Sequence, residues 1–273
     1  EMLKENNLLI QINFLPKFFF TNLANHSRFL KICIKASQKS NYFNYTEKEF
    51  KKKFMYNYKF KFKKFMRENE FILKNFFINE FIKNVEKATE ALRELFPETP
   101  LQKNEFLSQK YSADVFLKRE DLSPVRSYKI RGAFNSIKKA LAENSSVKNF
   151  VCASAGNHAQ GVAFVCKYLG MRGYIFMPVT TPKQKIDKTL SFGGNNIEIK
   201  LTGDYFDSTL KSAKEFSKKN SAIFLPPFDS LAVMEGQATV LYEILKQSDS
   251  KCHPDFIFLA VGGGGLSSGM LKY

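Results

Sequence analysis

The feature that most constrains the fold is a regular alternation of strand-like and helix-like patterns from residue 150 to residue 261. Short apolar runs typical of buried strands cover residues 150–153, 173–177, 196–200, 222–225 and 256–261. Amphipathic patterns typical of helices fill the intervals, at residues 158–169, 182–192, 206–219 and 231–246. Strands separated by helices usually pair in parallel and are covered on both faces. We therefore predict an α/β fold with open, mostly parallel twisted sheets and helices on both faces.

The regular patterning begins upstream, near residue 79. A helix is predicted over residues 80–96, ended by Pro97, and is followed by a strand at residues 114–117 and a helix at residues 133–142. With 273 residues, the chain is long enough for two linked lobes that share one cleft.

Residues 1–77 differ in composition from the rest of the chain. They hold 16 Lys and Arg against 6 Asp and Glu, which accounts for most of the net charge of +16. Aromatic residues recur at alternate positions over residues 54–62, an arrangement that can stack bases or lie on anionic lipid, although a charge run is usually a solvated face. We interpret residues 1–77 as a basic leader rich in Phe, Lys and Asn, outside the fold. Nucleic-acid or membrane-surface binding through the leader is a distant alternative.

The sequence contains no uninterrupted apolar segment of the roughly 18 residues that a transmembrane helix needs. We expect neither a membrane nor a nucleic acid as a partner. A cytoplasmic location is expected, unless the leader is an organelle transit peptide.

The cysteines and histidines argue against several kinds of site. The four cysteines are far apart and fall in no metal-ligand spacing, so we expect no metal and reduced thiols. His26, His158 and His253 are too scattered for a zinc site or a histidine-based catalytic triad.

A first candidate for chemistry is Lys129, at the entry to a helix and beside Arg131. The amino end of a helix and a second cation both lower the proton affinity of an amine, which favours the neutral form that attacks an aldehyde. An exposed lysine without a function is the alternative, and it is the commoner outcome for any single lysine.

A second candidate is a run of four glycines after the apolar residues 256–261. Gly262, Gly263, Gly264 and Gly265 precede Leu266, and successive amides without side chains can close around a phosphate. A flexible linker is the alternative, which the preceding apolar run disfavours. The run matches neither the dinucleotide fingerprint nor the P-loop.

A third candidate is the polar loop at residues 154–158, which follows a predicted strand. Asn157 can donate to a ring oxygen, and Ser154 and the loop amides can face a carboxylate, although an ordinary helix cap explains the same residues equally well. Both the loop and the glycines fall at carboxyl ends of predicted parallel strands, where ligands bind in such folds. An amine, a phosphate cradle and a polar loop together are what pyridoxal 5'-phosphate requires, so we predict this cofactor.

Six motifs in order closely resemble threonine dehydratase (threonine ammonia-lyase), a family in the fold type II group of pyridoxal phosphate enzymes. The resemblance covers residues 78–273. The motifs are LKREDL at residues 117–122, VRSYKIRGA at 125–133, CASAGNHAQGVA at 152–163, IFMPVTTPKQKI at 175–186, TGD at 202–204 and VGGGGL at 261–266.

The resemblance implies a role for each candidate. Lys129 would hold the cofactor as a Schiff base and remove the substrate Cα proton, and Asn157 would bond the ring hydroxyl. The phosphate would be bound by Gly262, Gly263, Gly264, Gly265 and Leu266, and the substrate carboxylate by Ser154, Ala155, Gly156 and His158. The implied reaction is β-elimination of water from L-threonine, and also from L-serine, to give a 2-oxo acid and ammonia. For threonine the product is 2-oxobutanoate, as in isoleucine biosynthesis or threonine catabolism, and we expect a homo-oligomer.

Family architecture implies a large cofactor-binding lobe formed by residues 78–149 and 228–273 and a small lobe formed by residues 150–227. The family continues beyond the position of Tyr273 and supplies there a partner for the pyridine nitrogen. We therefore interpret the chain as a fragment, truncated in its large lobe, that is expected to fold poorly or bind cofactor weakly.

A serine racemase-like enzyme is the alternative within the same fold. In that family a serine that serves as a second base stands where this chain has Ala155, which has no proton to give, so elimination is favoured. Cysteine synthase and threonine synthase relatives carry a threonine in place of His158 and fit less well.

Overall fold

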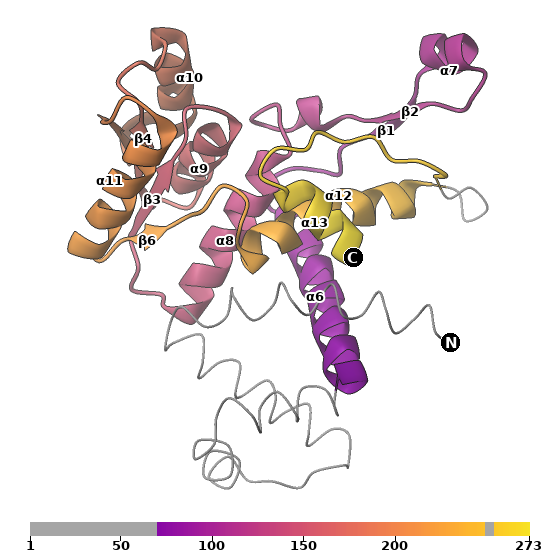
Figure 1. Cartoon of the computed structure of the whole chain (residues 1–273), viewed down its shortest axis with the longest axis horizontal. Coiled ribbons are helices and arrows are strands. Elements are labelled where there is room, and N and C mark those ends of the chain that lie inside the picture. Colours follow the sequence, from indigo (N-terminus) through magenta and orange to yellow (C-terminus); the bar gives the residue numbers. More distant parts are fainter. Residues whose placement is uncertain (1–69, 249–253) are drawn as a thin grey trace, which may run out of the picture. The chain divides into compact units, whose positions relative to one another are not determined.

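The structure is a computed structural model that describes residues 70–248 and 254–273 (Figure 1). The chain divides into a unit of residues 1–80 and a unit from Phe81 to Tyr273, and the features below belong to the second unit. Helix α6 (Glu70–Leu92) begins within the predicted leader. The hypothesis of nucleic-acid or membrane-surface binding concerns residues that lie almost entirely outside the described part of the chain.

A four-stranded parallel sheet organises the Phe81–Tyr273 unit. Its strands are β3 (Asn149–Ala153), β4 (Arg172–Met177), β5 (Ile197–Leu201) and β6 (Ile223–Phe224), in the order β5-β4-β3-β6. All three strand pairs are parallel. The helices between them are α9 (Asn157–Tyr168), α10 (Lys183–Gly193) and α11 (Phe206–Lys219). The predicted α/β fold with a parallel sheet is confirmed, and each of these elements lies within two residues of its predicted bounds.

Strand β3 shows why helices cover both faces of the sheet. Phe150 and Cys152 point into one apolar cluster, whereas Val151 and Ala153 point into another that contains Ala213 of α11. Side chains of a strand alternate between the two faces. Because residues 150–153 are all apolar, this strand needs an apolar helix on each side.

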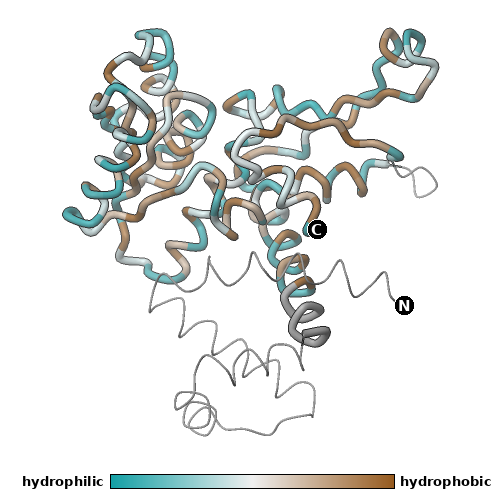
Figure 2. The backbone as a smooth tube through the Cα atoms, viewed as in Figure 1, coloured by the Kyte–Doolittle hydropathy of each residue, from teal (hydrophilic) through white to brown (hydrophobic). Residues whose placement is uncertain are grey.

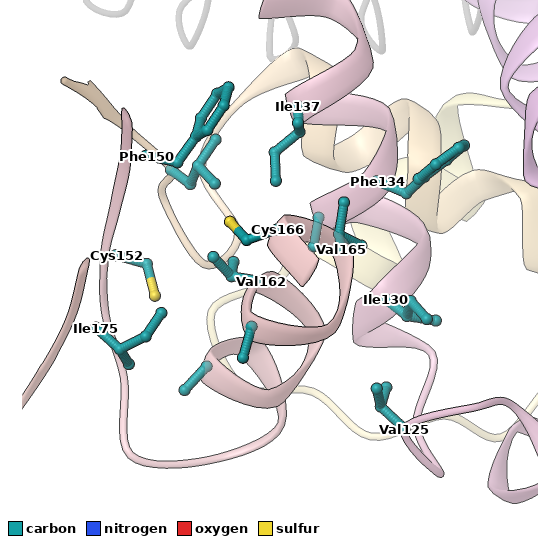
Figure 3. Close-up of a cluster of buried hydrophobic side chains, with 14 of the residues drawn as sticks. Val125, Ile130, Phe134, Ile137, Phe150, Cys152, Val162, Val165, Cys166 and Ile175 are labelled. Atoms are coloured by element: carbon teal, nitrogen blue, oxygen red, sulfur yellow. The ribbon is translucent and has the colours of Figure 1, made fainter. Parts of the chain in front are cut away.

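Helix α9 lies between the sheet and helix α8 (Lys129–Glu143), as Figure 3 shows. Val162 lies on the side of Cys152 and Ile175, and Val165 on the side of Ile137, and all of these side chains are buried. The two helices approach closely at Gly161, where a Cβ would lie 3.2 Å from the backbone nitrogen of Ile130. The start of α8 is thereby fixed against α9.

Helix α8 also crosses helix α12 (Leu231–Gln247) at short distance. A Cβ on Gly236 would lie 2.6 Å from the carbonyl oxygen of Arg131 and 2.7 Å from the Cα of Gly132. Only glycine permits two helix backbones to approach so nearly at this point.

A buried ion cluster joins the same two helices. The Arg131 guanidinium is fully buried and donates to both carboxylate oxygens of Glu120 and of Glu243, each at 2.8 Å. Lys118 and Arg93 also pair with Glu243, at 2.8 and 2.6 Å. Removing one partner from such a cluster leaves a buried charge uncompensated, which costs about 3–5 kcal/mol.

Several short elements between helices α6 and α8 complete this part of the chain. Strands β1 (Leu101–Lys103) and β2 (Phe116–Lys118) form an antiparallel pair around helix α7 (Glu105–Tyr111), and a 3-10 turn, η1 (Glu120–Leu122), follows. The strand predicted at residues 114–117 corresponds to β2. The short β1 and α7 were not predicted, because three and seven residues are too few to show a period.

The strand predicted at residues 256–261 is wrong. Among residues 70–248 and 254–273, no strand pairs with this segment. Leu259 packs against the buried cluster of Leu266 and Met270, but Phe256 is 80% and Phe258 95% exposed. Figure 2 shows the apolar character of this segment. An apolar run forms a strand only where a neighbouring strand accepts its backbone hydrogen bonds.

Substitution of Gly236 tests the helix crossing. We expect Gly236→Ala to lower the free energy of unfolding by about 1–3 kcal/mol, because the new methyl group meets backbone atoms that cannot move aside. Gly132→Ala is the matched control, since its Cβ would mainly meet the amide end of the Gln237 side chain. Urea unfolding followed by circular dichroism measures both. A Gly236→Ala chain as stable as the unmodified chain would contradict the close crossing.

The ion cluster predicts a pH dependence of stability. Burial by itself raises the pKa of Glu243, but hydrogen bonds and charges from Arg131 and Lys118 outweigh it and lower the pKa to about 2, from an ordinary value of 4.5. Because the folded pKa is lowered, the stabilisation is fully present above pH 4.5 and is lost as the pH falls toward 2. It amounts to about 3 kcal/mol.

Denaturant unfolding at pH 6 and pH 3 measures this loss. We expect Glu243→Gln to be less stable at pH 6 and to lose much less stability between the two pH values. Glu98→Gln is the control, since Glu98 pairs with Lys246 at 2.7 Å on the surface. This variant should still lose most of the stability that the unmodified chain loses between pH 6 and pH 3. A Glu243→Gln chain with an unchanged pH dependence would refute the assignment.

Candidate active site

Lys129 is the first residue of helix α8. Its side chain is half-buried, and its Nζ donates to the carbonyl oxygen of Pro227 at 2.8 Å. Burial lowers the pKa of the Lys129 ammonium. The direction of this shift was predicted correctly. Its cause is burial and not the charge of Arg131, because that charge is balanced by Glu120 and Glu243. Lys129 is thus not the exposed lysine of the alternative interpretation.

The backbone before Lys129 adopts an uncommon conformation. Arg126 has φ 56°, in the left-handed region that non-glycine residues rarely adopt. Ser123 Oγ bonds both the amide and the carbonyl oxygen of Ser127, at 2.9 and 3.0 Å. The Ser127 hydroxyl itself is buried and has no hydrogen-bond partner among the described residues. A buried polar atom without a protein partner needs an explanation, and a bound ligand is one explanation.

The polar loop connects β3 to α9. Ser154 Oγ accepts a hydrogen bond from the Gly156 amide at 3.2 Å. Gly156 is the N-cap residue of α9, and no side chain caps the helix. Within the described part of the chain, the exposed amide of Asn157 makes no hydrogen bond, and a Cβ on Gly156 would meet nothing within 4 Å. Since neither Ser154 nor Asn157 caps the helix, the capping interpretation does not hold.

His158 differs from the rest of the loop because its side chain points inward. The imidazole is buried, and its Nε2 lies 3.1 Å from the carbonyl oxygen of Leu225. A carbonyl only accepts, so Nε2 carries the proton. Burial lowers the pKa of His158 to about 4, and the bond to Leu225 only partly opposes this. The ring is therefore neutral and fixed, and any contribution to substrate binding falls to its backbone.

The glycine turn leads into helix α13 (Gly265–Lys272). Gly264 is the N-cap residue with φ 82°, and no side chain caps the helix. The first amides of a helix have no partner within the helix, so they remain available to an anion. Leu266 is buried against Met270 and Val240, which anchors the turn to the unit.

The three predicted motifs converge on residues 225–228. The carbonyl oxygens of Leu225 and Pro227 bond His158 and Lys129. The next residue, Phe228, packs against Gly263 and Gly265. The structure thus brings together Lys129, the polar loop and the glycine turn. The sequence analysis missed this segment, for which the only available signal was the pair of prolines after a short strand.

The site has the groups that a phosphorylated aldehyde needs. Lys129 supplies an amine with a lowered pKa, and the uncapped start of α13 supplies amides next to glycines that have no Cβ. The amide of Asn157 and the hydroxyl of Ser127 are without partners among the described residues. Pyridoxal 5'-phosphate fits this donor set.

A family model described as pyridoxal-phosphate dependent enzyme matches residues 92–273. The chain belongs to this family. It is 50% identical over 192 residues to L-threonine dehydratase biosynthetic IlvA of Staphylococcus saprophyticus and 49% identical over 192 residues to that of Bacillus subtilis. Each alignment covers 70% of this chain and 45% of the relative, so the chain spans less than half the length of these curated relatives.

Solved structures show the same relationship. The chain is similar to the processed form of threonine deaminase isoform 2 from Solanum lycopersicum, with a TM-score of 0.64 and 36% identity over 71% of this chain and 54% of that chain. It is also similar to maize serine racemase, with a TM-score of 0.63 and 29% identity over 69% of this chain and 55% of that chain. These likenesses confirm the predicted fold group. Within the described residues, no helix is long and apolar enough to cross a membrane.

The lowered pKa of Lys129 predicts that its amine titrates at a lower pH than an ordinary lysine. Competitive labelling of amines with acetic anhydride, read by mass spectrometry as a function of pH, should give Lys129 a midpoint below the ordinary 10.5. Lys246 is the internal control, because its hydrogen bond to Glu98 raises its pKa. A midpoint for Lys129 at or above that of Lys246 would rule out the neutral amine.

Proposed function

We propose that the chain carries the lysine-bearing part of a pyridoxal phosphate enzyme that deaminates L-threonine. The products are 2-oxobutanoate and ammonia: one water leaves the substrate and one is taken up on hydrolysis, so the overall reaction balances. The observation that carries the proposal is the convergence of Lys129, the polar loop and the glycine turn on residues 225–228. The names of the relatives support threonine as the substrate and a biosynthetic role.

Pyridoxal phosphate, when bound, supplies an electron sink for the charge left at Cα after proton removal. The residues proposed to hold its phosphate are Gly262, Gly263, Gly264, Gly265 and Leu266, whose amides lie at and before the start of α13. Asn157 is proposed to bond the ring hydroxyl, which its unpartnered side-chain amide supports.

Lys129 is proposed as the residue that carries the cofactor and then moves the Cα proton. A general base acts best when its pKa is near the working pH, and burial shifts Lys129 in that direction. The Pro227 carbonyl accepts from Nζ and thereby restricts where the amine points.

The polar loop is proposed to bind the substrate carboxylate. Ser154, Ala155 and Gly156 precede α9, and Gly156 faces open space. Amides at the start of an uncapped helix favour a carboxylate. The neutral, buried His158 would hold the loop in place through Leu225.

The division into two lobes and the assembly of the protein are also proposals, each with its own support. The parallel sheet lies within residues 149–224, which supports a small lobe at residues 150–227 and a large lobe from residues 78–149 and 228–273. Assembly into a homo-oligomer and a cytoplasmic location remain proposals by analogy with metabolic enzymes that act on small amino acids.

An amino-acid racemase is the second candidate. Structures of pyridoxal 5'-phosphate-dependent aspartate racemase, at 26% identity, and of maize serine racemase support it. Ala155 opposes it, because a methyl group cannot return a proton to the opposite face of Cα. Measurement of D-serine formed from L-serine separates the two candidates, and we expect none.

Reduction with borohydride tests the proposed role of Lys129. The 273-residue chain, mixed with a large excess of pyridoxal phosphate, should show an absorbance band at the edge of the visible range, and reduction should leave a covalent label on Lys129 in peptide mass spectra. In a separate, unreduced sample, L-threonine should yield 2-oxo acid. Lys129→Ala should abolish band, label and product, whereas Lys138→Ala, on the exposed face of the same helix, should not. A band and label that persist in Lys129→Ala would refute the assignment.

A further inference from the structure

The glycine turn, residues 262–265, packs against one residue, Phe228, through both its ring and its backbone. A Cβ on Gly263 would overlap the Phe228 ring sterically, and a Cβ on Gly265 would lie 2.8 Å from the Phe228 carbonyl oxygen and 3.0 Å from its Cα. By contrast, a Cβ on Gly262 would meet nothing within 4 Å, and one on Gly264 would approach no atom more closely than 3.7 Å. Two of the four glycines are thus in tight contact with Phe228.

Phe228 is itself held by elements that do not include the turn. The amide of Leu225 donates to the Val151 carbonyl oxygen of β3 at 2.7 Å. Ser230 caps α12 by accepting from the Val233 amide at 3.2 Å. Between these anchors, Pro226 and Pro227 have a restricted φ. The position of Phe228 is therefore set by the sheet on one side and by α12 on the other.

The turn has no comparable support from the residues before it. Residues 256–261 pair with no strand in the described part of the chain, and Val261, directly before Gly262, is 73% exposed. Four consecutive glycines lose more conformational entropy on ordering than any other residues would. The contacts that order the turn are therefore those of α13, which follows it, and those of Phe228.

We infer that Phe228 is a positioning residue that orders the glycine turn for phosphate binding. This inference rests on the proposed function, because it takes the turn as the phosphate site. Phe228 acts through the glycines and needs no contact with the cofactor. Since the carbonyl oxygen of Pro227 bonds Lys129, the same segment fixes the turn relative to the amine.

Two ligands that lack the aldehyde isolate the phosphate contribution. Pyridoxine 5'-phosphate and pyridoxine differ only in the phosphate, and neither reacts with Lys129. Isothermal titration of the full chain should show tighter binding of the phosphorylated compound. We expect Phe228→Ala to lower the affinity for pyridoxine 5'-phosphate about tenfold, because the ligand must then order the turn itself. The affinity for pyridoxine should change by less than about twofold.

Phe192→Ala is the matched control. Phe192 is also a half-buried phenylalanine, and it packs against Phe164 with ring centroids 6.4 Å apart, in α10 and α9. Its removal should leave the ratio of the two affinities unchanged. Phe228→Leu, which keeps most of the volume, should lose less than Phe228→Ala. Circular dichroism establishes that each variant is folded.

A double-mutant cycle gives a second, independent test. Gly263→Ala should weaken the binding of pyridoxine 5'-phosphate when Phe228 is present, because the new methyl group collides with the Phe228 ring. In the Phe228→Ala background the same substitution should have little further effect, since the ring is gone. Additive losses would overturn the contact as the cause.

The remaining outcomes separate the inference from the proposed function. If the wild-type chain does not distinguish the two ligands, the phosphate site itself is refuted, and this inference with it. If the wild type distinguishes them but Phe228→Ala keeps the wild-type ratio, only the inference is overturned. A loss of equal size for both ligands would also overturn it, since Phe228 would then act on the fold as a whole.

Discussion

The buried guanidinium of Arg131 is the interaction on which the arrangement of the site depends. It lies two residues after Lys129, and it bonds both Glu120 and Glu243. A charge in this position is stable only while both carboxylates stay in place. The cluster therefore fixes the first turn of α8 relative to η1 and α12. This ion cluster thereby also fixes the position of the Lys129 side chain, although Lys129 makes no contact within the cluster.

Close contacts at glycines extend this constraint to the other motifs. Gly161 allows α9 to approach the start of α8, and Gly236 allows α12 to do the same from another side. At Gly263 and Gly265 the turn approaches Phe228. A Cβ would be crowded at Gly161 and would collide with neighbouring atoms at Gly236, Gly263 and Gly265. Together these positions bring three motifs from distant parts of the sequence around residues 225–228. The proposed chemistry needs that proximity more than it needs any single contact.

Much of the fold could be predicted from the periodicity of the sequence. Strands β3, β4 and β5 and helices α9 to α12 follow patterns long enough to read, since each buries a continuous apolar face. The strand at residues 256–261 could not be judged in the same way. Its apolar pattern is as good as that of β3, but a strand also needs a neighbour, and no local pattern reveals whether one is present.

The sequence by itself determined the chemical types of the site: an amine at Lys129, a polar loop around Asn157 and a glycine turn at residues 262–265. It also indicated that the amine would be easier to deprotonate, although through the wrong cause. Only the tertiary structure decided that burial lowers the pKa of Lys129, that His158 points inward and that Phe228 supports the turn. The physical reason is that burial, hydrogen-bond partners and steric contacts here join residues about 30 to 100 positions apart, and local sequence patterns carry no information about such distances.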